Sequence, residues 1–138
     1  MRNIFVVVLL AIALTGCSTS QIDKLSCDPF PSKDWATDSY GKNGVRLSVL
    51  ECFETPRDSE NYVPKKLQQL DNQAVIELLG KPDLKLSADN NLTYIYFLEC
   101  IECNTTLPKV ENLANYGSYV SIAFRKYQVD RFQITWTD

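Results

Sequence analysis

Cysteine is the residue type that could carry chemistry in this 138-residue chain, because the sequence contains five cysteines and no histidine. Without histidine, Ser-His-Asp catalysis, Cys-His catalysis and every histidine-ligated metal site are excluded. The acidic residues between positions 28 and 60 are scattered among turn residues, which favours solvated surface charge over paired catalytic carboxylates. No Walker loop and no G-x-G-x-x-G motif is present. We therefore predict a protein without catalytic residues, metal or cofactor, and without a small-molecule substrate.

The first cysteine, Cys17, directly follows an apolar segment that covers residues 4–14. This segment is shorter than the ~20 apolar residues that span a bilayer. With Arg2 before it, it has the pattern of a secretory signal peptide. The tetrapeptide Leu14-Thr15-Gly16-Cys17 resembles a bacterial lipobox. That resemblance implies that the signal, residues 1–16, is removed and that Cys17 carries a diacylglycerol. A second or third acyl chain on the same residue would anchor the protein stably to a membrane.

The residue after the lipobox cysteine bears on which membrane is involved. In lipoproteins of bacteria with two membranes, an aspartate at this position tends to retain the protein in the inner membrane. Ser18 is the kind of residue that permits export, so the resemblance implies an outer-membrane lipoprotein that faces the periplasm. Residues 17–31 are polar and contain prolines, and we interpret them as a lipid-anchored flexible tether. Residues 32–138 are then expected to form a single periplasmic domain.

The composition of the chain limits its partners. Removal of residues 1–16 leaves 122 residues, enough for one domain with its own core. Arg2 leaves with the signal, so 13 of the 14 basic residues remain against 17 acidic residues, a net charge of −4. This mild acidity, without a basic block, argues against nucleic acid as a partner. We expect two partners: the membrane, through the lipid on Cys17, and a periplasmic or outer-membrane protein.

The other four cysteines indicate two disulfides in an exported chain, with three possible pairings. Cys100 and Cys103 form a C-x-x-C motif, for which three interpretations compete. A thioredoxin-like redox motif needs a helix here, whereas residues 104–108 have the sequence of a loop. A zinc site needs thiolates, which an oxidising compartment disfavours. We favour a local disulfide, which leaves Cys27 to pair with Cys52 across about 26 residues and contribute roughly 3–4 kcal/mol. Pairing of Cys27 with Cys100 or Cys103 remains open.

One helix has clear sequence boundaries, at residues 72–79. Asp71 can cap its first turn, and Gly80 followed by Pro82 ends it. Its apolar stripe consists of Val75, Leu78 and Leu79. A further turn or two is expected at residues 65–69. Residues 45–53 fit either a strand or a helix, and residues 55–61 are expected to form a loop.

Three strands are expected after this helix. Residues 93–98 are apolar on both faces, whereas residues 119–124 and 132–136 alternate between apolar and polar. Residues 125–128 are short enough to form a hairpin, and residues 103–117 form a long irregular loop. The predicted fold is α+β, with a short helix or helices packed on a three-stranded antiparallel sheet. An N-terminal extension stabilised by a disulfide completes it.

This order of elements, behind a lipobox, resembles the BamE family of outer-membrane lipoproteins, also called SmpA or OmlA. The resemblance covers about residues 67–136, and its matching residues are Gln73, Val75, Leu78, Leu79, Gly80, Pro82, Tyr94, Tyr96, Val120, Ile122, Phe124 and Val129. In that family a helix that ends in Leu-Leu-Gly-x-Pro packs on a three-stranded meander. The resemblance implies a non-enzymatic protein-binding module, with a role in outer-membrane protein assembly or envelope integrity. The alternative is an inhibitor or immunity protein that binds a periplasmic hydrolase, because related lipoprotein domains include such inhibitors.

We expect the partner to bind the sheet face opposite the helix. If Val120, Ile122 and Phe124 pack under the helix, the opposite face carries Tyr119, Ser121 and Ala123. One pair from the strand at residues 93–98 joins them, either Tyr94 and Tyr96 or Ile95 and Phe97. Tyrosine is enriched at protein interfaces. If residues 32–62 instead cover this face, the binding surface moves to the loop at residues 104–117. The apolar anchors of this loop are Leu107, Val110 and Leu113.

Overall fold

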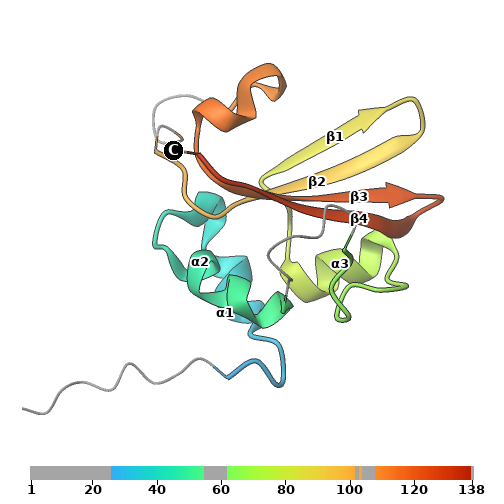
Figure 1. Cartoon of the computed structure of the whole chain (residues 1–138), viewed down its shortest axis with the longest axis horizontal. Helices are drawn as coiled ribbons and strands as arrows, with labels where there is room; N and C mark the ends of the chain where they lie inside the picture. The colour runs from blue at the N-terminus through green and yellow to red at the C-terminus, as the bar shows by residue number, and fades with distance from the viewer. Residues whose placement is uncertain (1–25, 55–61, 102, 104–107, 138) are drawn as a thin grey trace, which may run out of the picture.

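The computed structural model describes residues 26–54, 62–101, 103 and 108–137. It is an α+β domain with one antiparallel sheet in the order β1-β2-β3-β4 and several short helices (Figure 1). The strands are β1 (Leu84–Ala88), β2 (Asn91–Phe97), β3 (Tyr119–Arg125) and β4 (Gln128–Thr135). The α-helices are α1 (Ser32–Thr37), α2 (Val45–Val49) and α3 (Asn72–Leu79). Three 3₁₀ helices complete the set: η1 (Ser39–Gly41), η2 (Leu50–Phe53) and η3 (Val110–Asn115).

Several sequence predictions lie outside the described residues. These are the signal peptide, the lipidation site Cys17, the loop at residues 55–61 and the apolar anchor Leu107. Within the described part of the chain, no helix combines the length and the apolar character needed to cross a bilayer. The last residues of the predicted tether do have a described position. Phe30 is buried, so this part of the tether packs against the domain.

The sheet has four strands, whereas the sequence pattern predicts three. The additional strand is β1, which pairs with β2 through a two-residue turn at Asp89 and Asn90. Both turn residues have positive φ (47° and 65°), which Asp and Asn tolerate better than most residues. The sequence pattern does not predict β1, because Lys85, Ser87 and Ala88 have low strand propensity. The predicted hairpin between β3 and β4 is present, with its turn at residues 126–127.

The predicted helix at residues 72–79 is confirmed as α3. The carboxylate of Asp71 accepts a hydrogen bond from the backbone N–H of Ala74 (2.7 Å), as an N-cap does. Gly80 ends the helix with φ of 76° and ψ of −174°, a combination open essentially to glycine alone. The Tyr96 hydroxyl donates to the Gly80 carbonyl (3.0 Å) and so ties this end of α3 to β2. Burial raises the pKa of Tyr96 far above its usual value, so the phenol stays protonated and remains a donor.

Residues 45–53 are helical, so the strand alternative for this segment is wrong. The alternation of Val45, Leu47 and Val49 suggests a strand, but Leu47 is exposed. Four buried positions have helical spacing instead, namely Arg46, Val49, Leu50 and Phe53, and Cys52 is buried beside them. A charged residue occupies the first of these positions, so a hydrophobic pattern cannot reveal the stripe.

All three α-helices lie on one face of the sheet (Figure 1). Trp35 of α1 is the centre of their packing, with ring centroids 5.3 Å from Phe53 and 5.9 Å from Tyr96. The core on this side also contains Val120, Ile122 and Phe124. Helices α1 and α2 therefore share the helical side with α3, and of the residues between them Tyr40 reaches the cluster on the opposite side.

A buried ion pair joins the helical layer to the sheet. The guanidinium of Arg46 pairs with the carboxylate of Asp83, and both side chains are almost fully buried. Arg46 also donates through Nε to the Trp35 carbonyl (3.0 Å) and through Nη1 to the Phe97 carbonyl (3.2 Å). Asp83 accepts from the backbone N–H groups of Phe97 (2.8 Å) and Tyr40 (3.0 Å). This pair therefore connects α1, α2 and η1 to the start of β1 and the end of β2.

We predict that Asp83→Asn destabilises the protein strongly. Asparagine keeps the shape of aspartate but leaves the buried Arg46 charge without compensation, which typically costs about 3–5 kcal/mol. The control is Asp130→Asn, which breaks the solvent-exposed pair of Asp130 with Arg125 (3.6 Å). Exposed pairs contribute about 0–1 kcal/mol. Chemical denaturation of both variants measures the difference, and equal losses would contradict the role given to the buried pair.

Candidate functional site

The face of the sheet opposite the α-helices is formed by three rows of paired residues. One row is Leu84, Ile95, Ser121 and Gln133, the next is Leu86, Thr93, Ala123 and Arg131, and the third is Phe97, Tyr119 and Thr135. Val120, Ile122 and Phe124 pack on the helical side, so the alternation of β3 turns Tyr119 to this face. Ile95 and Phe97 join Tyr119 here, whereas Tyr94 and Tyr96 face the helices.

One end of this face is covered and the rest is not. The helix η3 lies over it (Figure 1), and Leu113 is buried there in a cluster with Ile95 and Phe97. Tyr40 stacks on Phe97 from the side, with ring centroids 6.2 Å apart. Beyond this cover the side chains are half-buried or of intermediate exposure. We call this part the open face, and its residues are Leu84, Leu86, Thr93, Tyr119, Ser121 and Ala123.

The open face changes in character across the sheet. Along β1 it carries two leucines, and along β3 it carries a tyrosine and two small residues. Along β4 it becomes polar, with the exposed side chains of Arg131 and Gln133. The outer face of a two-layer antiparallel sheet is ordinarily polar throughout, because it meets water. The apolar half over β1–β3 therefore differs from an ordinary solvated face.

The predicted protein-binding residues that the structure describes lie in η3 and where the covered end meets the open face. Tyr119 is half-buried, and its ring meets Phe97 edge-on at 5.9 Å between centroids. Val110 is 57% exposed at the start of η3, whereas Leu113 is buried beneath that helix. Leu107 is outside the described residues. The two described loop residues therefore differ in their surroundings. Leu113 packs against the sheet, whereas Val110 is exposed to solvent.

Two exposed apolar residues that the sequence pattern does not reveal lie at the same end of the sheet as η3. Ile101 is 72% exposed and Trp136 is 59% exposed. The N–H of Ile101 donates to the carbonyl of Tyr116 (2.9 Å), directly after η3. The N–H of Thr137, next to Trp136, donates to the Ser118 hydroxyl (3.1 Å). These bonds hold three separate segments at the same end of the sheet. We call Ile101, Val110 and Trp136 the apolar rim.

The cysteines are paired within the described residues. Cys27 is bonded to Cys52, with Cα atoms 5.2 Å apart, and Cys100 is bonded to Cys103, with Cα atoms 5.6 Å apart. These are the pairs that the sequence favours. The first bridge links the N-terminal segment to η2, and the second lies close to the apolar rim. Both cysteines of the second bridge also pack against the cluster beneath η3.

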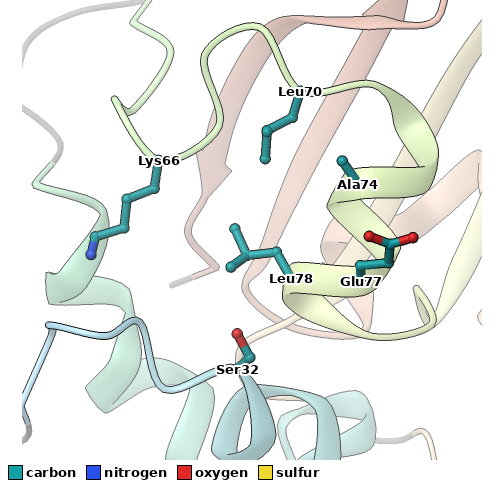
Figure 2. A pocket seen from close by; sticks show the side chains of 6 residues that line it. All are labelled: Ser32, Lys66, Leu70, Ala74, Glu77 and Leu78. Atoms are coloured by element: carbon teal, nitrogen blue, oxygen red, sulfur yellow. The ribbon is translucent and has the colours of Figure 1, made fainter.

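A groove of about 370 Å³ lies beside α3, on the helical side of the domain (Figure 2). Leu70, Ala74 and Leu78 line one wall, and Lys66 stands at the other. The ammonium group of Lys66 is engaged in contacts within the protein. Its Nζ donates to the Cys27 carbonyl (2.7 Å) and lies 5.7 Å from the ring centre of Phe30. The groove is therefore a seam between α3 and the N-terminal segment. No group of three or more potential metal ligands is found among the described residues.

Comparisons with models of known protein families, with curated proteins and with solved structures find no match to this chain.

We predict that the two disulfides differ in their contribution to stability. In the chain-entropy estimate the Cys27–Cys52 loop gives roughly 3–4 kcal/mol, whereas the four-residue Cys100–Cys103 loop gives about 2 kcal/mol. Double serine variants of each pair, compared by chemical denaturation, measure this difference. A larger loss from the variant that lacks Cys100 and Cys103 would show that the short bridge organises the end of the sheet.

Proposed function

We propose that this protein is a non-enzymatic protein-binding module of the bacterial cell envelope. Its binding surface is the open face together with the apolar rim. The observation that carries this proposal is the set of apolar side chains on the sheet face that the α-helices do not cover. Contiguous apolar surface of this kind marks sites of interaction in soluble domains.

The residue types on this surface support a protein partner. Tyr119 and Trp136 are aromatic residues with a polar group, which bury a large area and keep one hydrogen bond available. Such residues are enriched among the energetic centres of protein interfaces. Ser121, Ala123 and Thr93 are small, so a partner's side chains can approach the backbone of β2 and β3 between them. Charged residues lie at the margin, which is the usual arrangement of an interface.

The placement in the envelope is supported by the sequence. The lipobox at Cys17 implies a lipid anchor at the outer membrane, and paired cysteines suit an oxidising compartment. The resemblance to the BamE family supports the same placement, because α3 precedes the strands that carry the matching residues. Support of outer-membrane protein assembly or of envelope integrity is the role that follows from it.

We expect Tyr119→Ala and Trp136→Ala to weaken capture of the partner by at least tenfold in a crosslinking pull-down from intact cells. The matched control is Tyr127→Ala, because Tyr127 is 76% exposed in the β3–β4 turn at the far end of the sheet. Unchanged melting temperatures establish that the variants remain folded.

The outcomes of this experiment separate the possible functions. Equal capture by the wild type and the variants at Tyr119 and Trp136 would contradict the proposed surface. A captured hydrolase whose activity falls on binding would identify an inhibitor instead of an assembly factor.

A further inference from the structure

The N-terminal segment leaves the domain on its helical side. Cys27 and Phe30 pack against the core that the α-helices share with the sheet. The Cys27–Cys52 bridge ties this segment to η2, and the Lys66 ammonium group donates to the Cys27 carbonyl (2.7 Å). Figure 1 shows the segment beyond α1, on the side of the helices that is turned away from the sheet. Ser26, the first described residue, therefore lies opposite the open face.

The residue types of the open face and the apolar rim suit two kinds of occupant. Ile101, Val110 and Trp136 are all more than half exposed, at 72%, 57% and 59%. Exposed tryptophan and tyrosine beside aliphatic residues are typical of protein interfaces, but also of surfaces that enter the interfacial region of a bilayer. A lipid-anchored domain is close to both. The length of the tether decides between them.

The reach of the tether is limited by its number of residues. Eight residues, 18–25, separate the lipidation site Cys17 from Ser26. The chain between these two Cα atoms spans at most about 32 Å when it is fully extended. This limit holds for every conformation of the tether.

The domain is too large for this tether to place the open face on the membrane. A domain of about 110 residues has a radius of gyration of about 13 Å, which corresponds to a diameter of about 34 Å. With the open face on the bilayer, Ser26 would stand about 34 Å above the lipid surface. The path from Ser26 around the side of the domain and down to the lipid is about 44 Å. Both distances exceed the reach of the tether.

We propose that the lipid anchor holds the helical side toward the bilayer and presents the open face and the apolar rim to the periplasm. The occupant of this surface is a water-exposed protein segment, and not the bilayer. That segment lies about one domain diameter, ~34 Å, from the lipid surface. The inference rests on the proposed function, because it takes the lipid on Cys17 as its starting point, and it adds where the partner must be located.

Energy transfer from the protein to labelled lipid tests the orientation. The lipidated full chain is reconstituted into vesicles of phosphatidylethanolamine and phosphatidylglycerol, with a trace of lipid that carries an acceptor dye on its headgroup. Donor dyes are attached at Lys33→Cys, an exposed position of α1, and at Arg131→Cys, an exposed position on the opposite face. We expect transfer from Lys33→Cys to be at least twofold more efficient. Equal transfer, or more transfer from Arg131→Cys, overturns the inference.

A longer tether is the matched control, because it removes the limit on reach. Insertion of about twenty glycine and serine residues between Gln21 and Ile22 lengthens the reach by about 70 Å, enough for either side to face the bilayer. The difference in transfer between the two dye positions should then fall by at least half. If the insertion leaves this difference unchanged, the tether does not set the orientation and the inference is overturned.

Quenching of tryptophan by lipids with brominated acyl chains tests the other occupant. Trp136 is exposed on the apolar rim, whereas Trp35, the other tryptophan, is buried in the core. The Trp136→Phe variant gives the emission of Trp35 alone. We expect equal emission of Trp136 in brominated and ordinary vesicles. Quenching of Trp136 would identify the bilayer as the occupant of the rim and overturn the inference.

Flotation of the same vesicles distinguishes failure of the inference from failure of the proposed function. A chain that does not float with the vesicles lacks the anchor, and this result overturns the placement in the envelope together with the inference. A chain that floats but turns its open face to the lipid overturns the inference and leaves the anchor intact.

Discussion

The buried pair of Arg46 and Asp83 determines how the two layers of this domain meet. Apolar contacts alone would let α1 and α2 take several positions on the sheet, because such contacts have no preferred direction. The Arg46 guanidinium is bonded at fixed angles to Asp83 and to the carbonyls of Trp35 and Phe97. Its carbon also lies 5.4 Å from the ring centre of Tyr96, where a cation is favourable. A buried pair adds little net stability by itself, but it fixes the position of the helical layer.

This position has a consequence for the other side of the sheet. Because the three α-helices share one face, the other face is covered within the described chain by η3, Tyr40, Tyr116 and the Cys100–Cys103 bridge, all gathered on the cluster of Ile95, Phe97 and Leu113. Phe97 links the two sides, since its backbone bonds to Arg46 and Asp83 while its ring lies beneath η3. The segments that cover the opposite face therefore lie over the same end of β2 that the ion pair contacts. Away from that end, the strands keep their apolar side chains near the surface.

Local signals made α3 and three of the strands predictable. A cap, an apolar stripe and a glycine stop lie next to one another in α3, and β3 and β4 alternate regularly. The helix α2 was left undecided and the strand β1 was missed, each for a specific reason. The stripe of α2 begins with Arg46, whose burial depends on Asp83, a residue far away in the sequence. The strand β1 depends on its pairing with β2 more than on its own propensities. The sequence also did not determine which side chains of β2 face the helices, because Tyr94, Ile95, Tyr96 and Phe97 are all apolar enough to be buried.

The ion pair also orders the events of biosynthesis. A chain leaves the ribosome or an export channel from its N-terminus, and Arg46 emerges 37 residues before Asp83 and 51 residues before Phe97. Until those residues follow, the first helices have neither a countercharge nor a sheet to pack on. The Cys27–Cys52 bridge joins the two ends of this waiting segment, so it can limit the segment's extent before any strand exists. The N-terminal helices thus lack their buried ion-pair partner until Asp83 has emerged, and they lack the sheet until the strands have followed.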